Sequence, residues 1–143
     1  MEDNTRKLLE ECNSSCKMAI ESMDQVGPYV TDEKLKGTIQ DYNTKHKELE
    51  KESSRLLAQE GESGKEPGMF ASAFSWMTTE VKMMARDDNK QAAKIMMNGC
   101  NMGIQSITET MHECKEASRE SMSLAKKLVR TEEDFMQEMK HFL

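Results

Sequence analysis

The chain is 143 residues long, about the length of one domain, and we expect residues 1–143 to form a single unit. Hydrophobic residues make up 36% and charged residues 32%, and 20 Lys and Arg against 26 Asp and Glu give a net charge of −6. No stretch approaches the ~18 uncharged apolar residues of a membrane-spanning helix. A general nucleic-acid binder needs a positive face for phosphates. We therefore expect neither a membrane nor a nucleic acid among its partners.

The compartment is indicated by the start of the chain and by its cysteines. The acidic residues after Met1 resemble neither a secretory signal nor an Arg-rich transit peptide. Four cysteines are present without a Cys-x-x-Cys pair. We therefore expect a cytoplasmic, reducing setting, in which thiols are buried, catalytic or metal-bound and disulfides are rare.

The first half of the chain predicts two long helices, because apolar residues recur at intervals of three and four. They cover residues 4–26 and 31–60, on either side of Gly27-Pro28. The expected buried face of the first is Leu9, Cys12, Cys16, Ala19, Met23 and Val26. That of the second is Leu35, Ile39, Tyr42, His46, Leu49, Ser53 and Leu56.

The second half predicts three further helices after a Gly-rich linker over residues 61–68. They cover residues 69–85, 88–114 and 118–142, with acidic start signals near residue 88 and the least certain break near residues 115–118. Their expected buried faces are Phe70, Phe74, Met77, Val81 and Met84; Ala93, Met97, Cys100, Ile104, Ile107, Met111 and Cys114; and Met122, Ala125, Val129, Glu132, Met136, Met139 and Leu143.

These elements favour an all-α fold, specifically a ferritin-like antiparallel four-helix bundle. The first and last pairs of long helices form hairpins with short connections. The shorter helix over residues 69–85 then lies in the crossover between the second and third long helices, and about 25 Å of helix plus the linker can return the chain to the other end.

Four stretches carry a family resemblance: Lys45-His46-Lys47-Glu48-Leu49-Glu50, Lys65-Glu66-Pro67, Phe74-Ser75-Trp76-Met77 and Gly99-Cys100-Asn101-Met102-Gly103-Ile104. With them the chain resembles small bacterial ferritin-like proteins of unknown function, mostly from Gram-positive anaerobes. The resemblance implies a four-helix fold. It implies no activity, since a fold does not carry a function.

The chain departs from the pattern of ferritin-like di-iron centres, which take a Glu from each of two helices and a Glu-x-x-His from each of the other two. One Glu-x-x-His is present, formed by Glu109 and His112, and Glu109 is predicted to face away from the buried stripe. His46 has Asn43 three residues before it instead of a Glu. We therefore expect no standard di-iron centre.

Five polar or thiol residues on the apolar stripes form the candidate site. At ~1.5 Å per residue they fall within about one and a half turns of each other near mid-bundle. In one interpretation the cysteines fill the core and His46 bonds Glu132 or a water, which fixes the alignment of the helices. In the other, thiolates, imidazole and carboxylate hold one Zn²⁺ or iron ion. A disulfide between the first two cysteines and Cys–His nucleophilic catalysis are weaker alternatives. The five residues are Cys12, Cys16, His46, Cys100 and Glu132.

A second set of residues predicts an interaction surface, because the segments 69–85 and 96–104 are apolar on more than one side. Either the crossover helix covers this second side, or another protomer or a protein partner does, with adaptable methionines at the contact. We expect a non-enzymatic bundle that acts through self-association or a protein partner, with a Zn- or Fe-binding protein as the alternative. The surface residues are Trp76, Met83, Met96 and Met102.

Overall fold

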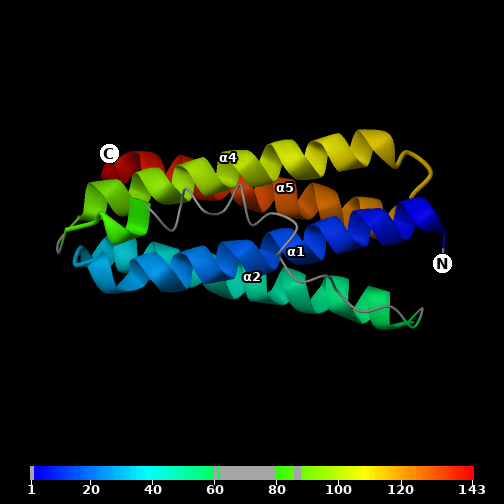
Figure 1. The fold of residues 1–143 in the computed structure, drawn as a ribbon, viewed down its shortest axis with the longest axis horizontal. Coiled ribbons are helices and arrows are strands. Elements are labelled where there is room, and N and C mark those ends of the chain that lie inside the picture. The colour runs from blue at the N-terminus through cyan, green and yellow to red at the C-terminus, as the bar shows by residue number, and fades with distance from the viewer. Residues whose placement is uncertain (1, 60, 62–79, 86–87) are drawn as a thin grey trace.

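The computed structural model describes residues 2–59, 61, 80–85 and 88–143, and within these ranges it contains helices and no strands. The all-α prediction is therefore confirmed. Four long helices run side by side in a bundle (Figure 1). They are α1 (Asp3–Val26), α2 (Glu33–Gln59), α4 (Asn89–Glu113) and α5 (Arg119–Met139), joined by the 3₁₀ turns η1 (Gly27–Tyr29) and η3 (Lys140–Phe142).

Each long helix begins at an acidic or hydroxyl side chain that accepts a hydrogen bond from the first turn. Glu2 caps α1, and Asp32 accepts from the backbone N–H of Leu35 at 3.0 Å in α2. Asp88 caps α4, and Ser118 caps α5 by accepting from Ser121 N at 3.2 Å. These side chains satisfy backbone N–H groups that have no partner inside the helix. The helices begin and end within one to three residues of the predicted bounds.

The order of the helices follows from contacts at the two ends of the bundle. At one end Asn89, the first residue of α4, accepts hydrogen bonds from the backbone N–H groups of Thr31 and Asp32 at 2.9 and 3.1 Å, just before α2 begins. At the other end Lys7 of α1 meets Glu113 of α4 at 3.0 Å. Each hairpin is thus antiparallel, and α4 starts at the end of the bundle where α2 starts (Figure 1).

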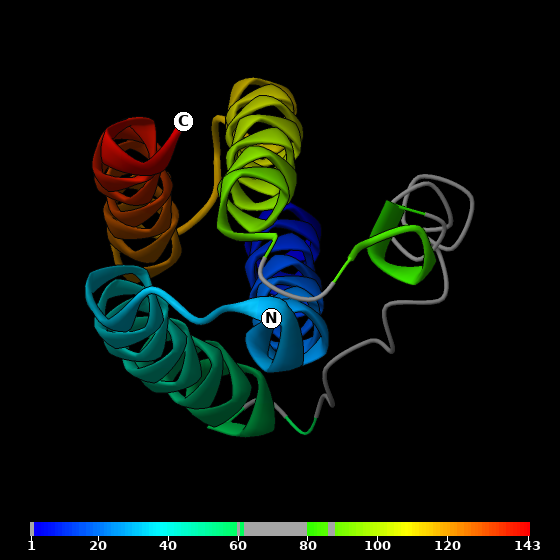
Figure 2. The same cartoon turned by 90° about the vertical axis from the view of Figure 1, so that its left-hand side faces the viewer.

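Viewed from the end, the four long helices surround a common core, with α1 between α2 and α4, and α5 closing the ring (Figure 2). The buried apolar residues divide into two clusters. One includes Met23, Tyr42, Cys100 and Phe135, and the other includes Cys12, Cys16, Leu49 and Leu128. The buried polar residues His46 and Glu132 lie between the two clusters along α2 and α5.

The buried faces match the predicted stripes best in α2, where all seven predicted positions are buried. In α5 the predicted stripe is only partly correct: Ala125, Glu132 and Met139 are buried as predicted, but the other positions lie beside the buried face. Met122, Val129 and Met136 are half-buried and Leu143 is 52% exposed, whereas the fully buried residues are Ser121, Leu124, Ala125, Leu128, Glu132, Phe135 and Met139. Leucines and a phenylalanine next to the predicted stripe take the inner positions, since α5 is apolar over a wide arc.

The predicted crossover helix over residues 69–85 lies mostly outside the described residues. In the part that the structure describes, residues 80–82 are helical, and Val81 and Met84 pack in the core cluster that includes Met23 and Tyr42. Gln91 of α4 donates to Glu80 at 2.8 Å and ties this segment to the bundle.

No helix in the described ranges combines the length and apolar character needed to cross a membrane.

Candidate functional site

Inside the bundle, His46 of α2 and Glu132 of α5 form a buried hydrogen-bonded pair, called the couple below. The His46 side chain is fully buried and Glu132 is 5% exposed. His46 Nε2 is hydrogen-bonded to Glu132 Oε1, and His46 Nδ1 lies 2.6 Å from the backbone oxygen of Tyr42. The imidazole therefore uses both ring nitrogens, one within α2 and one across to α5.

The two contacts indicate how many protons the couple holds. A backbone carbonyl can only accept, so Nδ1 carries a hydrogen and donates it to Tyr42. One further proton lies between Nε2 and Glu132 Oε1, because an unprotonated nitrogen facing a carboxylate would bring two acceptors together. Whichever atom holds that proton, the couple has no net charge, which is how an ionisable pair is tolerated in a core.

The pKa of His46 reflects the same balance. Burial lowers the pKa by penalising the charged imidazole, while the hydrogen bond to Glu132, its charge and the Tyr42 carbonyl raise it. The upward effects prevail, so the pKa of His46 lies above the ordinary value of 6.5. The imidazole thus holds its proton more tightly in the folded chain than in the unfolded one.

Aromatic rings and a glycine enclose the couple. Phe135 of α5 stacks on Tyr42 with ring centroids 4.6 Å apart, and its ring is tilted against His46 at 6.2 Å. On α4, a Cβ added at Gly103 would lie 3.3 Å from Glu132 Oε2. The missing side chain at Gly103 therefore lets α4 approach the carboxylate closely.

The charge of Glu132 also acts on the pKa of two cysteine thiols, Cys100 and Cys16. Burial raises the pKa of the Cys100 thiol well above its ordinary value, and the charge of Glu132 and a hydrogen bond to it raise the pKa further. Burial, followed by Cys12 and Glu132, raises the pKa of Cys16. The pKa of Cys12 is raised by burial to about 12. These thiols stay protonated at neutral pH, which is the unreactive form.

The five residues of the candidate site are all buried; His46 and Cys100 are hydrogen-bonded to Glu132, and the charge of Glu132 also raises the pKa of Cys16. Even so, no group of three or more His, Cys, Asp and Glu side chains in the described ranges is placed to hold a metal ion. Both nitrogens of His46 are already bonded, so no lone pair is directed at an ion. The four cysteines are free thiols, Glu109 is exposed as predicted, and His112 is exposed as well. The geometry therefore favours the hydrogen-bonded pair over a zinc or iron site.

The predicted surface residues lie in different settings. Met83 is 81% exposed, the highest value among the described large hydrophobic residues. Met102 is half-buried, and Met96 is only 3% exposed because it packs inside the core, which corrects its place on the predicted surface. Trp76 lies outside the described residues.

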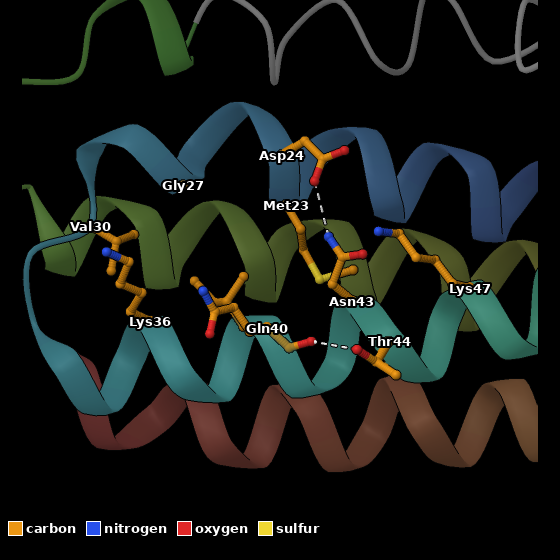
Figure 3. A pocket seen from close by; sticks show the side chains of 10 residues that line it. Met23, Asp24, Gly27, Val30, Lys36, Gln40, Asn43, Thr44 and Lys47 are labelled. Carbon is orange, nitrogen blue, oxygen red and sulfur yellow. Dashed lines mark hydrogen bonds between the residues drawn. The ribbon is translucent and has the colours of Figure 1, made fainter.

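A cleft of about 400 Å³ opens between the end of α1 and the first half of α2 (Figure 3). Asn43 donates from Nδ2 to Asp24 Oδ1 at 3.1 Å, and its own Oδ1 is buried without a donor. A buried acceptor left unpaired costs about 1–3 kcal/mol. A second cleft, of about 440 Å³, lies at the start of α5 and includes Lys115, Arg119 and Lys126 in its lining.

Two features of the interior could not be expected from the stripe analysis. Asn13 is fully buried and donates to Ser53 and Ser54 at 2.9 and 2.8 Å, while its Oδ1 has no partner. Glu11 of α1 accepts a hydrogen bond from Ser106 of α4. The one available signal was Ser53 on an apolar stripe, because a buried hydroxyl needs a polar neighbour.

Comparisons of the chain with protein-family models, with curated proteins and with solved structures found no match.

Proposed function

We propose that the chain is a ferritin-like four-helix module without enzymatic activity, which acts by associating with a second copy of itself or with a protein partner. The ferritin-like arrangement is supported by the two antiparallel hairpins, α1–α2 and α4–α5. The second hairpin starts, with α4, at the end of the bundle where α2 starts. A long connection between such hairpins is typical of that fold.

The observation that carries the proposal is that the thiols, imidazole and carboxylate of the candidate site are closed inside the core. The thiols of Cys12, Cys16 and Cys100 are buried and protonated, and His46 and Glu132 satisfy each other. A nucleophile or general base must reach its substrate, usually in a cleft. The clefts beside α1 and at the start of α5 are lined by no His and no Cys.

The surface for association is supported by the segment that precedes α4. Met83 extends into solvent while its neighbours Val81 and Met84 are buried against the bundle. This places a flexible apolar side chain on a firmly packed base, and methionine adapts its shape to a partner surface.

Light scattering coupled to size exclusion tests the proposal. We expect the wild type to form an oligomer, and we expect Met83→Asp to weaken it at least about tenfold, because a buried carboxylate would lack a partner. Ser123→Asp adds the same charge at an exposed site near the start of α5 and should leave the oligomer unchanged. A wild type that remains monomeric at all accessible concentrations contradicts self-association.

A further inference from the structure

We propose that the cleft between α1 and α2 binds a short, extended, acidic peptide segment of a partner protein. This goes beyond self-association through Met83, which is not among the residues that line the cleft. The cleft is lined by the end of α1, the turn after it and the first half of α2, and the buried residues Met23, Val30 and Ile39 supply its apolar part (Figure 3).

The charge of the cleft favours an acidic occupant. Lys36 and Lys47 both line it and are exposed, and neither side chain has a hydrogen bond or ion pair with any described residue. They are eleven residues apart on α2, about 16 Å along the helix, with Gln40 and Thr44 on the same edge. Unpaired lysines at both ends of one cleft stand out in a chain whose net charge is −6.

The acceptors in the cleft favour a peptide backbone over a simple anion. Asp24 is the one carboxylate of the lining, and it accepts from Asn43 Nδ2. This bond fixes the amide orientation, since the reverse orientation would set two oxygens against each other. Asn43 Oδ1 is then left without a donor, and Figure 3 shows Asp24, Asn43 and Lys47 pointing toward one another.

An extended segment satisfies these groups together. Its backbone N–H groups supply donors for Asn43 Oδ1 and the Asp24 carboxylate, and an apolar side chain in its middle packs toward Met23 and Ile39. Its acidic ends pair with Lys36 and Lys47, and at about 3.3 Å per residue roughly five residues span the 16 Å. Backbone hydrogen bonds combined with side-chain charges are a recurrent way of recognising peptides.

The test uses a fluorescein-labelled pentapeptide with one leucine between two pairs of glutamates, and fluorescence anisotropy with the full chain. We expect saturable binding that weakens as salt is added. We expect the double variant Lys36→Glu and Lys47→Glu to weaken binding at least about tenfold, and Asn43→Leu to weaken it with the lysines intact. Helical content of each variant is compared by circular dichroism.

The matched control is Lys115→Glu with Lys126→Glu, which makes the same charge change in the second cleft and should leave binding intact. The inference is overturned if the wild type does not bind the peptide, or if the control variant loses binding as much as the cleft variant. It is also overturned if the cleft variant loses self-association while the peptide never binds, since the occupant is then a second copy. Binding by a monomeric wild type would retain this inference while removing self-association.

Discussion

His46 and Glu132 make stability depend on pH in a defined direction. The pKa of His46 is higher in the folded chain than in the unfolded chain, where it is near the ordinary value of 6.5. The stabilisation is therefore fully present below about pH 6.5 and is lost as the pH rises through the folded pKa. We expect the free energy of unfolding of the wild type to fall as the pH rises above about 6.5, measured by urea denaturation monitored by circular dichroism.

The same experiment with Glu132→Gln isolates the acidic partner. A glutamine amide can donate to Nε2 while Nδ1 still donates to Tyr42, so the hydrogen bonds survive without the charge that raises the pKa of His46. We expect the decline with pH to disappear in this variant and to persist in His112→Gln, which changes an exposed imidazole. An equal slope in the wild type and Glu132→Gln would show that other groups cause it.

The sequence could identify this pair because a His and a Glu interrupt apolar stripes on α2 and α5, and a buried charge needs a partner. It could not show that the second nitrogen of His46 is taken by the Tyr42 carbonyl, because that contact depends on the side-chain conformation. The metal interpretation rested on residue types at one level of the bundle, and a shared level does not fix the directions of lone pairs.

Among the helices, α4 offers a test of close packing at two glycines one turn apart. A Cβ at Gly99 would meet nothing, whereas at Gly103 it would press on Glu132 Oε2 at 3.3 Å. We expect Gly99→Ala to stabilise the fold by about 0.5–1 kcal/mol, because alanine favours helix. Gly103→Ala should lose that gain, since His46 holds the carboxylate in place. Equal stabilisation in urea unfolding would mean that the carboxylate moves freely.

The predictability of the helices depended on the width of their apolar faces. In α2 charged residues flank a narrow stripe, so its seven inner positions were correctly predicted. In α5 Met122 and Val129 compete with Leu124 and Leu128 for the inner face, and only packing against α2 and α4 selects between them. The polar contact between Asn13 and Ser53 was missed for a similar reason, because α1 buries residues next to its apolar stripe.

At the scale of the whole molecule, we predict that the protein binds no metal ion stoichiometrically. Because His46 and Glu132 satisfy each other and no suitable ligand group is found in the described ranges, we expect protein purified without chelator to contain only substoichiometric zinc and iron by atomic emission. We also expect chelator to leave the melting temperature unchanged. A stoichiometric metal that is lost in both Cys16→Ser and His46→Ala would instead establish the metal centre.

The course of the chain through the bundle was predictable because linker and helix lengths limit the ways in which two hairpins can join. The hydrogen bonds between Asn89 and the backbone before α2 were not predictable, because the residues that they join lie 58 and 57 positions apart in the sequence. Side chains that meet across such separations leave no periodic signal in a single sequence.

The polar layer between two apolar clusters also limits how the helices can slide. If α5 moved one turn, about 5.4 Å, along α2, Leu128 or Met136 would come opposite His46. The apolar contacts would be largely replaced by similar ones, but the imidazole would lose its carboxylate partner while still buried in the core. A single buried couple thus makes neighbouring alignments of an otherwise apolar core unfavourable, and selects one among several that hydrophobic burial alone would accept.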